Sequence, residues 1–262
     1  MKPTTKHFLL YLLCLALPLS GCGSDVSAVS FVELKGHSSE GIRLTFSPDG
    51  KRIVTANPNN ETLRIWDAET GKELKQVDVR LPSPLTAAVF SPDGKKIVTS
   101  SRDKTARIWD VETGKELHKL EDASGGMYFV AFSPDGQKIV TVNPDALSLR
   151  IWNPDSGAKL HEIEGHSKPV LRVAVLPDNK RVVTASGDGT LRIWDADSGK
   201  ELQVLQKWRV DEKGFIFPWI EVSPDGKKIA IWATEGTARL VDEKKGEPKV
   251  IHHPVRILTL PG

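Results

Sequence analysis

The sequence of 262 residues has few cysteines, no apolar run long enough to span a membrane and no excess of one charge. Its two cysteines are Cys14 and Cys22, and Cys14 lies inside an apolar N-terminal run, so the rest of the chain has no pair to form a disulfide. That run, residues 8–19, contains Pro18 and falls short of the about 20 apolar residues that a spanning helix needs. The chain beyond it must therefore be held together by an ordinary hydrophobic core, for which it is long enough.

Charge and composition argue against a nucleic-acid partner. Once Lys2 and Lys6 are set aside with the N-terminal run, basic and acidic side chains are equal in number. No cluster of Lys and Arg with interleaved aromatic residues follows, which is the pattern that a phosphate-binding surface needs. We therefore expect no binding to nucleic acid.

The N-terminus has the layout of an export signal. Two lysines precede the apolar run, which closes on residues 19–22, Leu-Ser-Gly-Cys. This ending resembles the lipobox of bacterial lipoproteins, which implies that residues 1–21 are removed and that Cys22 carries a lipid anchoring the protein to the envelope membrane. Residues 22–30 then form a short linker before a domain of residues 31–262. An ordinary signal peptide with a chance cysteine, and a cytoplasmic protein with an apolar start, remain alternatives.

The residue after the lipidated cysteine bears on location. Gly23, rather than aspartate, follows Cys22. By resemblance to enterobacterial sorting, this favours the outer over the inner membrane, with the domain facing the periplasm or the cell surface.

Two markers repeat along the rest of the chain with a period of about 43 residues. The first is Ser-Pro-Asp-Gly at residues 47–50, 91–94, 133–136 and 223–226, with Leu-Pro-Asp-Asn at 176–179. The second is Ile-Trp-Asp or a close variant at residues 65–67, 108–110, 151–153, 193–195 and, degraded, 240–242. Five units therefore follow one another.

Each unit reads as four short strands. Proline presets the first central position of a type I turn and glycine accepts the exit geometry, so Ser-Pro-Asp-Gly predicts a hairpin. β-Branched segments such as residues 53–55 and 97–99 follow that turn, and the Ile-Trp-Asp strand leads through a second glycine turn into a fourth strand. The fold class is all-β and antiparallel.

These repeats resemble the WD-repeat family, and the resemblance covers residues 31–262. It implies a β-propeller of four-stranded antiparallel blades, about five in number, with an incomplete sixth as an option. It also implies a structural network of His, Ser/Thr, Asp and Trp in each blade. The fourth unit matches it fully, with His166, Thr184, Asp188 and Trp194. The second unit keeps Thr99, Asp103 and Trp109 without the histidine.

The sequence leaves the closure of the ring open. Residues 33–37 look like a fourth strand that could complete the last blade, whereas residues 252–261 resemble the opening of a further unit. Three arrangements remain: five blades with a surplus strand, a sixth blade shared by both termini, or open edges that pair with another molecule as a homo-oligomer.

No constellation of catalytic, metal-binding or cofactor-binding residues stands out. His161 and His166 flank a zinc-protease-like string, but they are five residues apart rather than four and lie on a strand that runs into a turn. Neither a nucleophile elbow nor a phosphate-binding glycine loop is found. We therefore expect no catalytic residue, no metal and no cofactor.

An insertion before the fifth unit concentrates four aromatic residues and an arginine: Trp208, Phe215, Phe217 and Trp219, with Arg209. On a loop these side chains would be candidates for interface anchors. The alternating positions of Phe215, Phe217 and Trp219 fit an ordinary buried strand equally well. In that case Trp208 and Arg209 are the exposed pair.

The leading functional hypothesis is a non-catalytic scaffold that binds protein partners and is held by its lipid at a bacterial envelope membrane. The alternatives are an envelope propeller enzyme, such as a hydrolase or a lactonase-like protein, and a subunit or remnant of a larger propeller. Fold alone cannot supply the missing catalytic constellation.

Overall fold

The structure is a computed structural model that describes residues 34, 43–57, 62–79, 82–121, 127, 129–143, 147–207, 219–232, 238–242 and 248–251. All regular secondary structure in these ranges is β-strand. Among the described residues there is no helix long and apolar enough to cross a membrane.

The strands form five antiparallel sheets of four, each in simple sequential order. Sheet 1 contains β1 (Arg43–Phe46), β2 (Arg52–Asn57), β3 (Thr62–Asp67) and β4 (Glu73–Asp78), and sheet 2 contains β5 (Leu85–Phe90), β6 (Lys96–Ser101), β7 (Thr105–Asp110) and β8 (Glu116–Glu121). Sheet 3 contains β9 (Phe129–Phe132), β10 (Ile139–Asn143), β11 (Ser148–Trp152) and β12 (Lys159–Ile163), and sheet 4 contains β13 (Val170–Val175), β14 (Arg181–Ser186), β15 (Thr190–Asp195) and β16 (Glu201–Lys207). Sheet 5 contains β17 (Trp219–Val222), β18 (Lys228–Trp232), β19 (Ala238–Asp242) and β20 (Pro248–Ile251).

The Ser-Pro-Asp-Gly turn joins the first two strands of a sheet by local hydrogen bonds. In sheet 1, the Ser47 hydroxyl donates to Asp49 Oδ1 at 2.5 Å and accepts from the backbone N–H of Arg52 at 2.9 Å. Gly50 has a φ of 70°, a conformation that L-residues with a side chain adopt only under strain. The turn therefore sets the register of β1 against β2 through its own residues.

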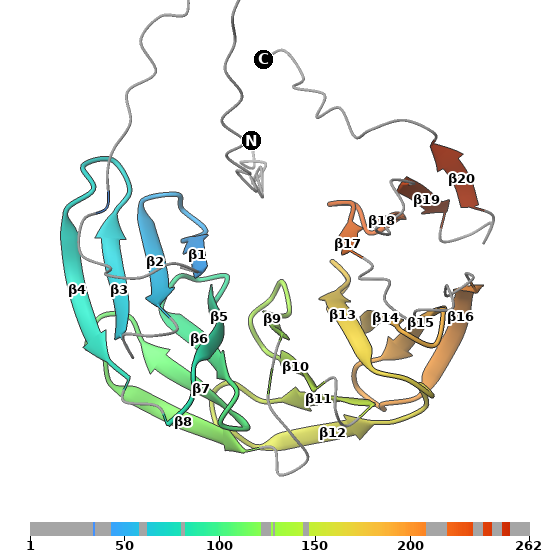
Figure 1. The fold of residues 1–262 in the computed structure, drawn as a ribbon, viewed down its shortest axis with the longest axis horizontal. Helices are drawn as coiled ribbons and strands as arrows, with labels where there is room; N and C mark the ends of the chain where they lie inside the picture. The colour runs from blue at the N-terminus through green and yellow to red at the C-terminus, as the bar shows by residue number, and fades with distance from the viewer. Residues whose placement is uncertain are drawn as a thin grey trace, which may run out of the picture.

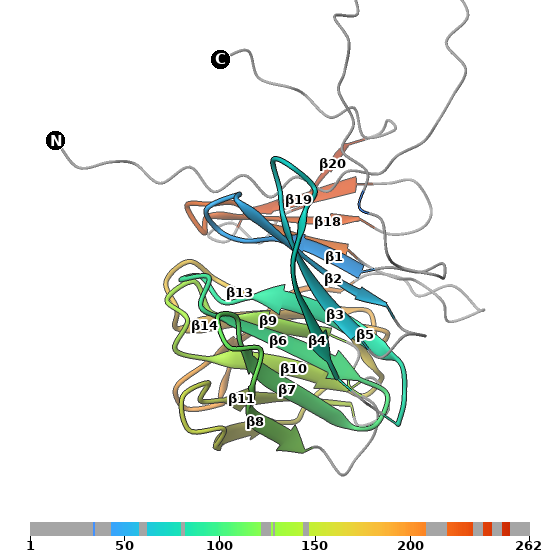
Figure 2. The ribbon, with the colours of Figure 1, turned by 90° about the vertical axis from the view of Figure 1, so that its left-hand side faces the viewer.

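The five sheets lie face to face along an arc (Figures 1 and 2). Strands β1, β5, β9, β13 and β17 line its inside, and β4, β8, β12, β16 and β20 lie on its outside. Buried side chains fill the space between neighbours: Val54, Leu63 and Ile65 of sheet 1 share one cluster with Phe90 and Trp109 of sheet 2. Because the central sheets are apolar on both faces, they are stabilised mainly by the sheets on either side.

The all-β prediction and the four-stranded unit are confirmed, and the described residues form five blades of the propeller type. The arc is open, since sheets 1 and 5 lie at its two ends and are apart from each other (Figure 1). Residues 252–262 lie outside the described residues, as do all of residues 33–37 except Leu34, so the predicted surplus strand and shared sixth blade stay predictions.

Candidate functional site

The fourth blade contains a buried chain of hydrogen bonds that joins four segments. Trp194 on β15 donates its indole N–H to Thr184 Oγ1 on β14 at 2.8 Å, and Thr184 Oγ1 lies 2.7 Å from His166 Nε2. His166 Nδ1 lies 2.8 Å from Asp188 Oδ2 in the turn between β14 and β15. The Thr184 hydroxyl, which accepts from Trp194, can donate its own hydrogen to Nε2 while Nδ1–H donates to the carboxylate. In this arrangement His166 is neutral.

The surroundings of the network keep that charge state. Burial lowers the pKa of His166 below its ordinary value, and the hydrogen bond and charge of Asp188 oppose this only in part. Burial alone would raise the pKa of Asp188, but hydrogen bonds from Thr190 and His166 outweigh it, and the pKa is lowered. Asp188 is therefore an anionic acceptor and His166 a neutral link at neutral pH.

This arrangement predicts acid-sensitive stability. Because the pKa of His166 is lower in the folded than in the unfolded chain, protons bind the unfolded chain more readily, and stability is lost as the pH falls below about 6.5. The lowered pKa of Asp188 acts in the same direction, but only near pH 4 and below. Urea titrations between pH 7.5 and 5.5 should show wild type approaching His166→Gln in stability. His161→Gln, which leaves the network intact, should keep the wild-type slope; a parallel loss in wild type and His166→Gln would contradict the assignment.

The Thr–Trp part of the network recurs in three other blades. The indole N–H of the tryptophan donates to the threonine hydroxyl at 2.7–2.9 Å in the pairs Trp66–Thr55, Trp109–Thr99 and Trp152–Thr141. In the second blade Asp103 accepts from Thr105, at 2.6 Å from its hydroxyl, and lies 3.5 Å from Arg107. A hydrogen bond that repeats in each of these blades supports the structure of the blade, which is the role implied by the sequence.

A second repeated pair joins the third and fourth strands and was missed by the sequence analysis. An arginine on the third strand meets a glutamate on the fourth, with N–O distances of 2.5–3.0 Å, in Arg64–Glu73, Arg107–Glu116, Arg150–Glu162 and Arg192–Glu201. The signal was the arginine that precedes each Ile-Trp. These pairs leave the outer part of each blade charged but locally neutralised.

Neighbouring blades are joined by ion pairs near the Ser-Pro-Asp-Gly turns. Lys138 of sheet 3 lies 2.9 Å from Asp197 of sheet 4, and Lys96 of sheet 2 pairs with Asp155 of sheet 3. At the first junction, Arg52 of sheet 1 instead donates to the carbonyl of Gly94 at 3.1 Å. These contacts join sheets 1 to 2, 2 to 3 and 3 to 4, in each case near a turn of the repeat.

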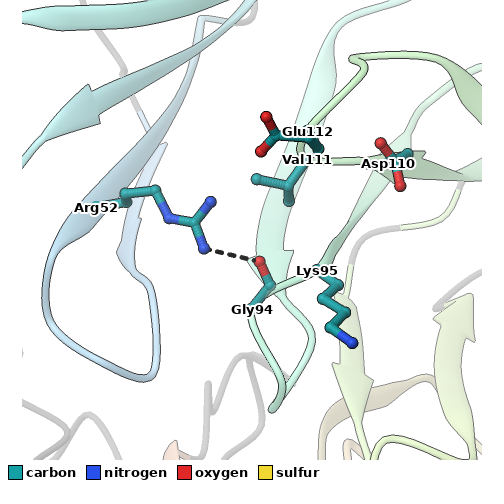
Figure 3. Close-up of a pocket in the computed structure, with 6 residues that line it drawn as sticks. All are labelled: Arg52, Gly94, Lys95, Asp110, Val111 and Glu112. Atoms are coloured by element: carbon teal, nitrogen blue, oxygen red, sulfur yellow. Dashed lines mark hydrogen bonds between the residues drawn. The ribbon is translucent and has the colours of Figure 1, made fainter.

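The first junction opens into a pocket of ≈ 320 Å³ (Figure 3). It is lined by Arg52, Gly94, Lys95, Asp110, Val111 and Glu112. The described residues contain no group of three His, Cys, Asp or Glu side chains placed to hold a metal. Arg52 of sheet 1 faces Glu112, which follows sheet 2's β7, across the opening. The pocket is therefore a wide part of the junction between these two blades.

The structure brings together only part of the predicted site residues. His166, Thr184, Asp188 and Trp194 form one network, which engages both ring nitrogens of His166. Trp219 begins β17, where only its backbone is described. Cys22, Trp208, Arg209, Phe215 and Phe217 lie outside the described residues.

The outside of the arc carries a further feature that the sequence analysis did not assign. One exposed leucine lies near the start of each outer strand of the first four blades: Leu74, Leu117, Leu160 and Leu202. The signal was a leucine following Glu or Lys after each second glycine turn. Single exposed leucines are ordinary on protein surfaces, so the row marks accessible apolar surface and identifies no ligand.

Comparison with known proteins gives two matches. Residues 28–67, 77–110 and 157–195 match the family described as "WD domain, G-beta repeat". An uncharacterized WD repeat-containing protein of Synechocystis sp. is 36% identical over 59 residues, which are 22% of this chain and 17% of that relative. The matched segments include most of blades 1, 2 and 4.

Proposed function

Because the chain carries WD repeats, which imply a protein-interaction scaffold, we propose that it is a non-catalytic scaffold held at a bacterial envelope membrane by a lipid on Cys22. The WD-repeat matches carry the scaffold role. The lipobox-like ending at residues 19–22 supports the anchoring, with Gly23 favouring the outer membrane.

The blade architecture supports a binding role. Buried polar side chains such as Trp194, Thr184, His166 and Asp188 are engaged in structural hydrogen bonds, and exposed groups that a partner could contact lie on turns and outer strands. A rigid array of this kind presents those turns in fixed positions, which lowers the entropic cost of binding a protein surface. Trp208 and Arg209 stay the predicted exposed anchors.

The anchoring is tested by replacing Cys22 with serine. Wild type should fractionate with membranes, and mass spectrometry should find its mature N-terminus at an acylated Cys22. Stable anchoring needs two acyl chains or an equivalent second signal, so we expect more than one chain on this residue. Cys22→Ser should leave the membrane fraction. Cys14→Ser, within the segment predicted to be removed, should behave as wild type. An unmodified N-terminus or an intact residue 1–21 segment would contradict lipidation.

The same membranes serve to test the scaffold role. Crosslinking followed by quantitative mass spectrometry should recover a reproducible set of protein neighbours with wild type, and that set should be depleted with Cys22→Ser. Absence of reproducible neighbours in anchored wild type would contradict the scaffold, whatever the outcome for the lipid.

A further inference from the structure

The junctions between joined blades show which residues a blade buries against its neighbour, and the two free ends can be compared with them. In three junctions the proline of one Ser-Pro-Asp or Leu-Pro-Asp turn covers the turn glycine of the next blade. A Cβ placed on that glycine would lie 3.1–3.7 Å from the proline ring, in the pairs Pro48–Gly94, Pro92–Gly136 and Pro177–Gly226. At Gly50, the same position of sheet 1, no atom of the described chain lies within 4 Å. The turn of sheet 1 is therefore open on the side on which the other turns are covered by a preceding blade.

The inner strand of sheet 1 repeats this observation with larger side chains. Leu44 and Phe46 are 59% and 49% exposed, whereas Ala88 and Phe90, their equivalents in sheet 2, are each 4% exposed. The burial of the latter pair comes from sheet 1, which packs on them. Further out on the same face of sheet 1, Thr55 and Trp66 are buried, so the open surface consists of the inner strand and the adjoining turn.

Sheet 5 presents the opposite half of a junction. Ala230 on β18 is exposed. The equivalent residues of the four preceding sheets face the next blade and are completely buried, namely Val54, Val98, Val140 and Val183. Pro224 holds the position from which Pro48 and Pro177 cover the next turn glycine, and like them it is exposed.

The charges at the two ends are complementary. The ion pairs between blades join the basic residue after a Ser-Pro-Asp-Gly turn to the acidic residue after the next Trp-Asp or Trp-Asn-Pro, as in Lys138–Asp197. At the free ends these positions hold Lys228 in sheet 5 and Glu69 in sheet 1, and both are exposed. The two ends therefore contain the charged, apolar and turn elements of one further junction.

We propose that sheet 5 of one molecule packs against sheet 1 of a second copy, through Ala230, Pro224 and Lys228 on one side and Leu44, Phe46, Gly50 and Glu69 on the other. The two ends of a single chain are apart (Figure 1), and bringing them together would require changes at all four packed junctions. Because the joined faces differ, the contact is heterologous, and copies add in one direction unless the rotation closes a ring. This self-association depends neither on the lipid nor on the scaffold role.

Sedimentation velocity of the purified full chain over a hundredfold range of concentration tests the apolar half of the contact. Wild type should form dimers and larger species as concentration rises. Leu44→Glu should weaken association by about tenfold or more, because it places a charge in the centre of the contact. The matched control is Leu74→Glu, which changes an equally exposed leucine of the same sheet on its outer strand and should associate as wild type.

A charge exchange tests the pairing of the ends. Glu69→Lys and Lys228→Glu should each weaken association by about two- to fivefold, the range of an exposed ion pair. The double variant should recover most of the wild-type constant. Lys227→Glu, the same change at the exposed neighbouring position, should have no effect.

Three results would overturn the proposal. One is a wild-type chain that stays monomeric at all concentrations. If the sedimentation coefficient of that monomer changes with the charge variants, the two ends meet within one chain. Another is equal weakening by Leu44→Glu and Leu74→Glu, and the third is a double charge variant no better than the single ones. Association through the apolar N-terminal run alone would be as strong in Leu44→Glu as in wild type, and this result would also contradict the proposed contact.

Discussion

Replacing Trp194 with alanine is expected to lower the free energy of unfolding by about 3–5 kcal/mol. The Trp194 side chain is buried between the third and fourth blades, in one cluster with Val140, Leu149 and Ile151. The imidazole of His166 lies against the indole edge-on, with ring centroids 5.7 Å apart. The substitution therefore leaves a large cavity and also removes the donor to Thr184.

The measurement is a urea or thermal unfolding curve of the variant beside wild type. Leu202→Ala, on the outer strand of the same blade, is the control, since its exposed side chain should change stability by no more than about 0.5 kcal/mol. Because blades stabilise one another mainly through neighbours, the Trp194→Ala loss should appear first in blades 3 and 4, which hydrogen exchange can resolve. Equal losses for the two variants would contradict the assignment of Trp194 to the core.

The blade itself could be predicted because its determinants are local. The turn around Ser47 closes through bonds among residues at most five apart, and Thr184 and Trp194 are ten residues apart on paired strands. Such contacts repeat whenever the sequence repeats. The predicted all-β fold of four-stranded units is confirmed, and three segments of the chain match the WD-repeat family.

The arrangement of the blades could not be predicted in the same way. Whether an array closes depends on the angle between successive sheets, which arises from packing across each junction, such as Val54 and Leu63 against Phe90. The ion pairs between blades join residues 59 positions apart in Lys96–Asp155, across one whole repeat, where no local pattern connects them. The sequence therefore left three arrangements of the termini open, and the described residues form an open arc. The insertion with Trp208 interrupts the repeat, so the repeat offers no template for it.

Replacing Asp188 with alanine is expected to cost about 3 kcal/mol, more than the same change at Asp103. Each carboxylate is almost fully buried and accepts from the threonine two residues later, Thr190 or Thr105. Asp188 accepts in addition from His166 and from the backbone N–H of Ser167, both of which would lose this partner.

Asp103→Ala removes a carboxylate of the same kind from a blade without the histidine, so it is the matched control, with an expected loss of about 1–2 kcal/mol. The difference between the two losses measures what the histidine adds to a blade. That difference should nearly vanish when His166→Gln is the background for Asp188→Ala, because the two residues act through one chain of hydrogen bonds and their effects are not additive. Equal losses at Asp188 and Asp103, or additive effects of Asp188→Ala and His166→Gln, would mean that His166 contributes by packing on Trp194 alone and that the hydrogen-bonded chain adds no stability of its own.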